Sequence, residues 1–436
     1  MKRFKFLLLG IFTLLSQLVF SQDVTSKINS GDTAWMLIST ALVMFMTAPA
    51  LALFYGGLVK RKNVLNILMQ CFITLAVVSL LWVICGYTLS FSPKSLIPGF
   101  IGNFDFAFLK NVGLGASDTY ATTIPHLLFV IYQGMFAVIT PALIIGAFAE
   151  RMKFSSFLIF VIVWCIFVYF PVAHWIWSTD GWLFKLGVVD FAGGIVVHIN
   201  AGIASLVAAI MIGKRKYLKP TPPHNLTFTM FGAAMLWFGW FGFNAGSALG
   251  ANGLAANAFV VTNTAAAAAV VIWFILDLFF VKKPTMLGSA TGAIAGLAAI
   301  TPAAGFVDVG ASIVIGAASS LICYFMVVFV KNKIGYDDAL DAFGVHGIGG
   351  IFGSIIVGVF ASPLIQSAYS GLLFGNPKQL FIQVFGSVVV IVYSLVLTII
   401  IFKVIDIFMG LRVSEKEEAM GLDITQHNER GYTVIE

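Results

Sequence analysis

Long apolar runs separated by short polar connections dominate the chain. An α-helix rises 1.5 Å per residue, so about 20 apolar residues suffice to cross the hydrocarbon of a bilayer. The pattern predicts eleven such helices. They are expected at residues 33–58, 64–91, 123–149, 154–172, 190–212, 225–249, 256–281, 285–304, 309–330, 340–361 and 379–408.

The composition agrees with a membrane protein and disfavours a soluble one. Hydrophobic residues make up 60% of the chain, charged residues make up 10%, and the mean hydropathy is +0.99. Soluble domains average roughly 45–50% apolar and 25% charged residues. The net charge of +6 comes from short basic clusters between apolar runs, where membrane topology explains it and no nucleic-acid partner is expected. We therefore predict an all-α polytopic membrane protein.

The first residues resemble a secretory signal peptide. Lys2, Arg3 and Lys5 precede an apolar run, and small-residue context for cleavage follows at Ser21. Removal of residues 1–21 would leave the mature amino terminus outside. The alternative is an uncleaved additional helix.

Basic residues gather in alternate connections, which predicts the orientation of the chain. One side holds Lys60, Arg61, Lys62, Arg151, Lys153, Lys214, Arg215, Lys216, Lys219, Lys282, Lys283, Lys331, Lys333, Lys403, Arg412, Lys416 and Arg430. The other side holds only Lys27, Lys94, Lys110, Lys185 and Lys378. The expected location is the cell inner (cytoplasmic) membrane, with the tail (residues 409–436) in the cytoplasm. An odd number of spans satisfies this orientation.

Two polar stretches interrupt the apolar runs. Asp190 and His198 belong to the fifth predicted span, and Asp341 and His346 to the tenth. An ionisable side chain at the bilayer centre costs roughly 2.5–3.5 kcal/mol on insertion scales, so such groups mark functional sites. Because five is an odd number, two successive sets of five spans have opposite orientations in the membrane, as in inverted-repeat transporters.

The predicted transmembrane domain, residues 22–408, thus contains a first half (33–212), an inverted second half (225–361) and an eleventh helix (379–408).

Glycines accompany both histidines. At α-helical spacing, Gly194 and Gly202 share a face with His198. Gly350 and Gly353 do the same for His346. Another helix or a small molecule could approach each imidazole closely, although the two histidines could also form a structural hydrogen-bonded pair. Asp190 could cap its helix or attract a cation directly, and the sequence leaves both roles open.

Other residue patterns exclude several classes of site. The four cysteines lie inside apolar runs without a CxxC pair, so no disulfide framework, metal site or cofactor is expected. The chain lacks a set of nucleophile, base and orienting group, so it is not expected to be an enzyme. An aromatic and small-residue segment, 237–247, resembles an interface belt, which many membrane proteins share.

Several motifs resemble the ammonium transporter family, the Amt, Mep and Rh group, in its bacterial Amt type. The resemblance covers nearly the whole mature chain. The motifs are Phe54-Tyr-Gly-Gly-Leu-Val59, Gly146-Ala-Phe-Ala-Glu-Arg151, Asp190-Phe-Ala-Gly-Gly with His198, Trp237 to Ser247, Thr301-Pro-Ala-Ala-Gly305, Phe343-Gly-Val-His346-Gly and Gly410-Leu-Arg-Val413.

This resemblance implies residue roles and partners. Phe136, Trp177 and Ser247 resemble the external cation site, and Asp190 resembles the carboxylate that maintains it. The implied pore residues are His198, His346, Phe136, Phe243 and Tyr132. The resemblance also implies a homotrimer and a PII-type regulatory protein at the tail.

Three positions depart from the family pattern. Tyr132 replaces a frequent Phe, residues 178–180 replace a glycine-rich run, and Ser414 replaces a usual Pro. The mixed charges of the tail by themselves favour solvated disorder. The resemblance instead implies that the tail, with Arg412 and Asp423 as regulatory residues, docks onto the inner face.

The implied function is recruitment of ammonium at the outer aromatic site, its deprotonation, and conduction of ammonia along the two histidines. A proton could travel separately or remain outside. One alternative is an ammonium sensor with little flux, and another is a bis-histidine haem protein.

Overall fold

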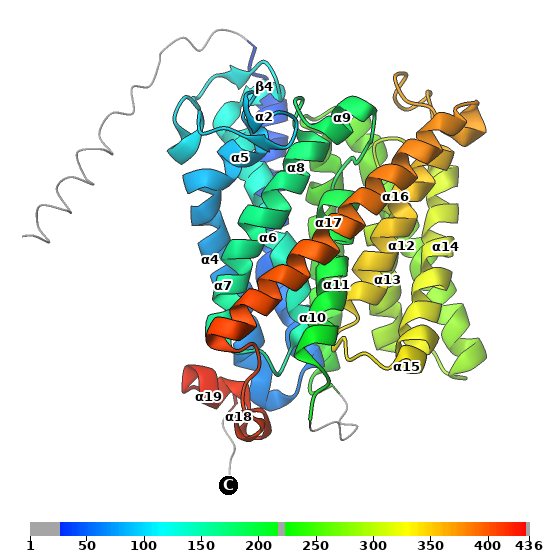
Figure 1. Cartoon of the computed structure of the whole chain (residues 1–436). Coiled ribbons are helices and arrows are strands. Elements are labelled where there is room, and N and C mark those ends of the chain that lie inside the picture. The colour runs from blue at the N-terminus through cyan, green and yellow to red at the C-terminus, as the bar shows by residue number, and fades with distance from the viewer. Residues whose placement is uncertain (1–26, 217–222, 433–436) are drawn as a thin grey trace, which may run out of the picture.

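The computed structural model describes residues 27–216 and 223–432, so the expected signal peptide lies outside the described residues. Helices run side by side through the molecule (Figure 1). Ten helical segments in the described ranges are long and apolar enough to cross a membrane. They are Ser30–Leu58, Arg61–Phe91, His126–Phe148, Phe154–Leu186, Gly194–Ile212, Leu226–Ala248, Gly253–Phe280, Val309–Ile334, Phe343–Phe360 and Pro377–Met409.

A further apolar helix, α13 (Met286–Ile300), lies where the sequence predicts the eighth span. It has 15 residues, which at 1.5 Å per residue is shorter than the other spans. The ten long segments lie at the positions of ten predicted helices and α13 lies at that of the eighth, but α13 is shorter than a candidate span, so the count of eleven stays a prediction.

Helical elements of the first half carry short interruptions. They are α2 (Ser30–Phe45), η1 (Met46–Leu51), α3 (Ala52–Leu58), η2 (Arg61–Asn63), α4 (Val64–Leu81), η3 (Trp82–Gly86), α5 (Tyr87–Phe91), η4 (Ala107–Leu109), α6 (His126–Phe148), α7 (Phe154–Trp164), η5 (Cys165–Tyr169), α8 (Phe170–Trp177), α9 (Trp182–Leu186), η6 (Gly194–Ile199) and α10 (Asn200–Ile212). Two small antiparallel hairpins lie between α5 and α6. They pair β1 (Ser95–Ile97) with β2 (Ile101–Gly102) and β3 (Ala116–Ser117) with β4 (Ala121–Pro125).

The second half has the same character and is followed by one long helix and the tail. Its elements are α11 (Leu226–Ala245), η7 (Gly246–Ala248), α12 (Gly253–Phe280), α13, α14 (Val309–Phe325), η8 (Met326–Val330), α15 (Lys331–Ile334), η9 (Phe343–Gly347), α16 (Ile348–Phe360) and η10 (Leu372–Phe374). The remaining helices are α17 (Pro377–Met409), α18 (Glu415–Met420) and α19 (Leu422–His427).

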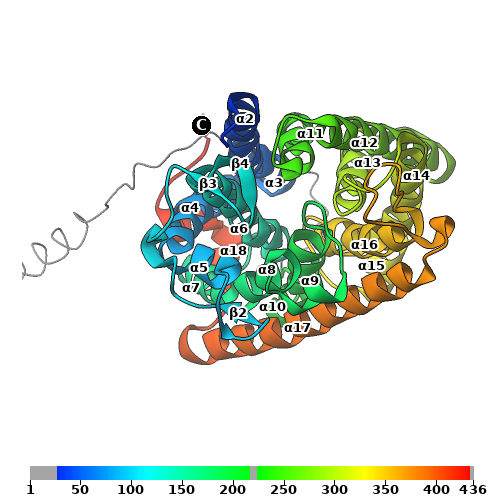
Figure 2. The same cartoon turned by 90° about the horizontal axis from the view of Figure 1, so that it is seen from above.

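α17 crosses the molecule obliquely and connects the two halves (Figures 1 and 2). Its Gln383 side-chain amide donates to the backbone oxygens of Val189 and Ser354, at 2.8 and 3.0 Å. Val189 precedes η6 in the first half, and Ser354 lies in α16 of the second. One buried glutamine thus fixes the long helix against both histidine-bearing segments.

The tail does not follow the expectation of solvated disorder drawn from its charges, which is wrong for the described residues. Ser414 and Glu417 form a reciprocal capping box at the start of α18. Arg412 donates to the backbone oxygen of Ile212 and forms an ion pair with Glu418, at 3.0 and 2.7 Å. Because Ile212 lies 200 residues from Arg412, this bond joins the tail to the end of α10, and the tail folds onto the ends of the helices (Figure 1).

Candidate functional site

Two buried histidines lie next to each other where the halves meet. The ring centroids of His198 and His346 are 5.2 Å apart, and their planes are within 9° of parallel. His198 is 1% exposed and His346 is 4% exposed. Sequence reasoning placed these residues in separate halves, and the structure brings them together.

Both histidines occupy π-helical turns. His198 lies in η6 and its amide donates to Gly193, five residues earlier, and His346 lies in η9. The α-helical spacing expected for Gly194 and His198 was therefore wrong, because the wider turn shifts the direction of the side chains. Each π turn continues into a 13-residue α-helix, α10 or α16.

Glycines allow the two histidine segments to cross closely. A Cβ on Gly202 would lie 2.1 Å from the Cα of Gly347, and a Cβ on Gly350 would lie 2.7 Å from the Cβ of His198. Two of the glycines predicted to flank the imidazoles, Gly202 and Gly350, therefore let the opposite histidine segment come close.

The histidines line a narrow apolar cavity of about 10 Å³. This volume is close to the minimum that holds one water molecule. A haem macrocycle does not fit there, which removes the structural basis for the haem alternative. The other lining residues are Met46, Leu51, Phe54, Ile139, Leu143, Val197, Leu236, Trp240, Phe243 and Ile294.

The ring nitrogens are not used by the protein itself. Both nitrogens of His198 and Nδ1 of His346 are buried without a hydrogen-bond partner among the described residues. A purely structural histidine pair would satisfy these atoms, because buried polar groups are costly when unpaired. The arrangement instead leaves these three imidazole nitrogens unpartnered beside an apolar cavity.

A second cavity, of about 240 Å³, lies on the side of the hairpins and contains the predicted cation-site residues. Phe136, Trp177 and Ser247 all line it. The centroids of Phe136 and Trp177 are 5.7 Å apart in an edge arrangement. The structure thus places three residues from distant parts of the sequence around one space.

Aromatic rings connect this outer cavity to the histidines. Phe136 and Phe243 lie 4.4 Å apart by centroid, and Phe243 and His198 lie 6.1 Å apart. Phe243 also lines the narrow cavity. The two phenylalanine rings therefore lie between the outer cavity and the histidine passage, where the resemblance implies a gate, and the gating role stays a prediction.

Tyr132 lies beside this gate and outside the lining of both cavities. It is fully buried, and its hydroxyl donates to the backbone oxygens of Gly242 and Phe243 at 2.9 and 3.0 Å. The same hydroxyl lies 3.2 Å from the Oγ of Ser247. The added hydroxyl thus ties α6 to the end of α11, which carries Phe243, and to η7, which carries Ser247.

Asp190 caps the first histidine segment. Its Oδ1 accepts from the amides of Gly193 and Gly194 at 2.9 and 2.6 Å, and its Oδ2 accepts from Ile195 and Val196 at 2.7 and 3.0 Å. The helix therefore begins four residues after Asp190, so the expectation that Asp190 itself starts the helix was wrong.

The backbone of Asp190 also reaches the outer cavity. Its carbonyl oxygen accepts from the indole of Trp177 at 2.9 Å. Asp190 consequently holds both the cation-site tryptophan and the amides before His198. This geometry gives the carboxylate a positioning role, and its two oxygens are already shared among four amides.

Residues 178–180 also take defined places. Asp180 is bound by Lys185 at 2.5 Å and by the hydroxyl of Ser95, while Thr179 lines the outer cavity. The unusual carboxylate therefore ties α9 to the first hairpin.

Sequence reasoning missed Asp338, the counterpart of Asp190 in the second half. Asp338 precedes His346 by the same eight residues that separate Asp190 from His198. Its Oδ2 accepts from the amide of Phe343, the first residue of η9, at 2.8 Å. The matching interval is visible in the sequence, but Asp341, which lies closer to His346, was singled out in its place.

A third cavity, of about 570 Å³, lies on the side of the tail. His346 lines both this cavity and the narrow one. Asp277, Asp341 and Arg215 also line it. The outer cavity, phenylalanine pair, histidine passage and this wide cavity therefore follow one another through the protein.

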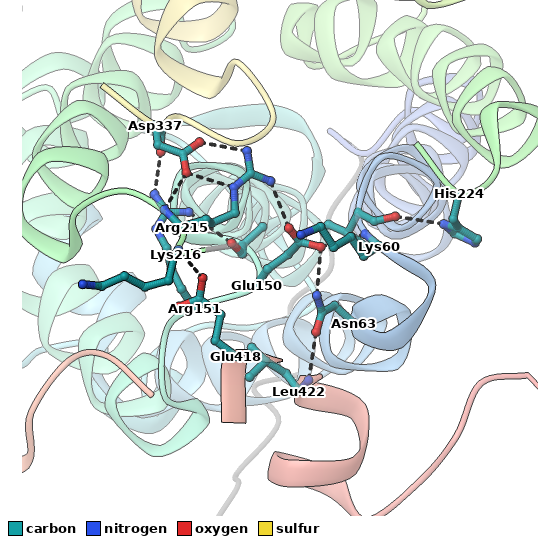
Figure 3. Close-up of polar contacts among 12 residues, drawn as sticks. Lys60, Asn63, Glu150, Arg151, Arg215, Lys216, His224, Asp337, Glu418 and Leu422 are labelled. Carbon is teal, nitrogen blue, oxygen red and sulfur yellow. Dashed lines mark hydrogen bonds and ion pairs between the residues drawn. The ribbon is translucent and has the colours of Figure 1, made fainter. Parts of the chain in front are cut away.

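A polar network beside the wide cavity connects it to the tail (Figure 3). Arg215 forms ion pairs with Glu150 at 2.9 Å and Asp337 at 2.8 Å. Burial raises the pKa of Asp337, but the hydrogen bonds and charge of Arg215 outweigh it and lower the pKa to about 2. Asn63 donates to Glu150 and accepts from the amide of Leu422, both at 2.8 Å.

Asp423, for which the resemblance implies a regulatory role, is also bound. Asp423 is 2% exposed, and its Oδ1 accepts from the amide of Asn66 at 2.9 Å. Arg412 and Asp423 thus hold the two ends of the folded tail.

Comparisons with known proteins give a single family. The model of the Ammonium Transporter Family matches residues 34–432. An ammonium transporter of Bacillus subtilis (strain 168) is 51% identical over 403 residues, which cover 92% of this chain and 98% of the relative.

Solved structures agree with this assignment. The crystal structure of Saccharomyces cerevisiae Mep2 has a TM-score of 0.85 at 35% identity and covers 91% of this chain and 90% of that one. A structure described as a sensor Amt protein has a TM-score of 0.83 at 30% identity, with coverages of 91% and 98%. The match along nearly the whole chain, together with the site described above, shows that this protein belongs to the ammonium transporter family.

Proposed function

We propose that the protein binds ammonium in the outer cavity and conducts ammonia through the histidine passage. The observation that carries this proposal is the narrow apolar cavity with unpartnered imidazole nitrogens. A molecule that crosses it must be small, able to hydrogen-bond and uncharged within the apolar section.

The outer cavity suits a small cation. The rings of Phe136 and Trp177 each offer about 0.5–2 kcal/mol of cation–π attraction. The hydroxyl of Ser247 is a hydrogen-bond acceptor. This site favours ammonium without excluding potassium, so selectivity requires a later step.

Deprotonation provides that step. A buried Lys side chain can have its pKa lowered from about 10.4 to about 5 or 6, because an apolar environment disfavours the charged form. Ammonium can likewise give its proton to solvent water in the outer cavity as ammonia enters the Phe136 and Phe243 gate, whereas potassium has no proton to give. Asp190 would support this step by holding Trp177 and the amides before His198 in place.

Currents and uptake together test the proposal. Purified protein in proteoliposomes is expected to take up methylammonium, and solid-supported-membrane recordings will show whether charge accompanies it. One net charge is coupled to the membrane potential by about 2.3 kcal/mol per 100 mV, whereas neutral ammonia is not. Absence of any ammonium-dependent uptake in a folded preparation would overturn the transport proposal. Absence of current with retained uptake would eliminate net cation transport.

A sensor with little flux is the second candidate, supported by the folded tail and the similarity to the sensor Amt protein. Methylammonium uptake at the rate of an established relative would exclude it. We further propose a homotrimer in the inner membrane, with the tail in the cytoplasm and available to a PII-type protein.

A further inference from the structure

Two cavities far from the pore share the final described residues of the tail. The first is an apolar groove of about 540 Å³ between α2–α3 and α4, whose lining includes Leu53, Leu68 and Phe72. Phe72 is 64% exposed, as expected for a side chain that faces lipid in a membrane span. Residues His427 and Glu429 close the end of the groove nearest the tail.

The second cavity is a basic pocket of about 190 Å³. Arg61, Lys62 and Arg430 line it, together with Tyr432 and the carboxylate of Asp423. Arg61 precedes the membrane span of α4, so the pocket lies at the level where that span leaves the membrane. The bilayer presents its lipid phosphates at this level.

Some charged side chains of the pocket are bound by the protein and others are not. Lys62 donates to the backbone oxygens of Glu418 and Ala419, and Asp423 accepts from the amide of Asn66. Arg61 and Arg430 are exposed and form no ion pair within the described residues. Two guanidinium groups are therefore available, and guanidinium is the side-chain group best suited to bidentate phosphate binding.

The tail lies between the two cavities and is fixed there. A Cβ on Gly431 would lie 3.2 Å from Leu65, a residue of the groove. The hydroxyl of Tyr432 and Nε2 of His224 are 2.9 Å apart, and Nε2 of His427 lies 3.1 Å from Oδ1 of Asn66. Glu429 lines the groove and the next residue, Arg430, lines the pocket, so the cavities are adjacent.

We propose that the groove and the pocket together bind one anionic phospholipid from the leaflet on the side of α18 and α19. Arg61 and Arg430 hold the phosphate, and an acyl chain lies along Leu53, Leu68 and Phe72. Basic clusters at the ends of membrane helices attract anionic lipids, with each Lys or Arg contributing to the affinity. A soluble phosphate would use only the pocket and leave the apolar groove without a ligand.

Native mass spectrometry of the purified full chain in detergent tests this proposal. Phosphatidylglycerol should bind more tightly than phosphatidylcholine, and Arg61→Gln with Arg430→Gln should weaken the binding of phosphatidylglycerol roughly tenfold or more. The charge-conserving variant, Arg61→Lys with Arg430→Lys, should retain most of this preference. Lys94→Gln with Lys110→Gln, in the hairpin region, is the matched control and should change nothing.

A second arm tests the groove. Met69→Trp places a larger side chain in the groove at a residue already 37% exposed, so the fold should tolerate it. It should weaken phosphatidylglycerol binding while leaving the pocket intact. Glycerol 3-phosphate, the soluble probe, should not bind measurably.

Three results would overturn the proposal. They are equal binding of the two lipids, unchanged lipid binding by the glutamine variant, and binding of glycerol 3-phosphate as tight as that of the lipid. If a second copy of the chain covered the groove, the glutamine variant would likewise leave lipid binding unchanged. None of these results depends on ammonium transport, so the transport proposal stands or fails separately.

Discussion

Gly202 and Gly347 meet backbone to backbone at the crossing of the two histidine segments. A Cβ on Gly202 would lie 2.1 Å from the Cα of Gly347 and 2.4 Å from its amide nitrogen. Backbone atoms cannot rotate away as a flexible side chain can. The distance between His198 and His346 therefore depends on the absence of a side chain at Gly202.

Gly202→Ala is expected to separate the histidine segments and to cost about 1–3 kcal/mol of stability through overpacking. Ammonium uptake should fall with it. Thermal unfolding and proteoliposome uptake measure the two effects. The matched control is Gly253→Ala, because a Cβ there meets nothing within 4 Å. If Gly202→Ala resembled this control in both measurements, neither stability nor ammonium uptake would depend on the close crossing.

Asp190 combines a charge with a helix cap, and two substitutions separate them. Asp190→Asn keeps an oxygen for the amides but removes the charge, so the protein should fold while uptake falls about tenfold or more. Asp190→Ala removes the cap as well and should lower the free energy of unfolding by about a further 1–2 kcal/mol. Uptake and thermal unfolding of both variants give the comparison. Wild-type uptake by the Asn variant would leave the carboxylate charge without a role in transport.

Asp338 predicts a dependence of stability on pH. Burial first, and the neighbouring Asp341 carboxylate second, raise the pKa of Asp338 from 3.8 to about 6. Between these values the unfolded state loses the proton while the folded state keeps it, so stability falls as pH rises from about 4 to about 6. The contribution of Asp338 is present below pH 4 and lost above pH 6.

Asp338→Asn should reduce this slope, since the amide stays neutral and can still accept from Phe343. Thermal unfolding at pH 4, 5, 6 and 7 compares the two proteins. An unchanged slope in the variant would show that Asp338 does not titrate in this range. Asp118→Asn, at an exposed ion pair, controls for removal of a carboxylate as such.

Asn63 links the tail to the buried ion pairs. It is 2% exposed and bonds both Glu150 and the amide of Leu422. Asn63→Ala leaves the buried amide of Leu422 without its acceptor, while Glu150 keeps its bonds to Arg215 and to the amide of Lys60. The change should cost about 1–3 kcal/mol and loosen the tail. Tryptic cleavage after Lys416 should become faster. Asn332→Ala removes an exposed asparagine bond within one helix and is the control. Equal cleavage rates would indicate that the tail is held by its other contacts.

Much of the fold was predictable because hydropathy and span length are local properties. The positions of the spans followed from apolar runs, and the two histidines were identified because ionisable residues are rare in such runs. Among the cation-site residues, Phe136, Trp177 and Ser247 came from the resemblance, since aromatic residues alone do not distinguish a site from an interface belt.

The features that the sequence did not predict depend on contacts between residues far apart in the chain or on small energy differences between helix types. The π turns at His198 and His346 were not predictable, because apolar and glycine-rich sequences suit both helix types. The docked tail depends on Asn63 and Lys216, which bond Leu422 and Glu418 from more than 190 residues away along the chain. Mixed charges with no visible partners were therefore misread as solvated.

Replacement of both pore histidines tests the central claim most directly. His198→Leu with His346→Leu keeps the passage narrow and apolar but removes every imidazole donor and acceptor. Proteoliposome uptake of methylammonium, with potassium flux measured in parallel, is the assay. We expect the double variant to lose uptake selective for ammonium while remaining folded. Unchanged flux and unchanged selectivity would contradict the assignment of the histidine passage as the conduction path.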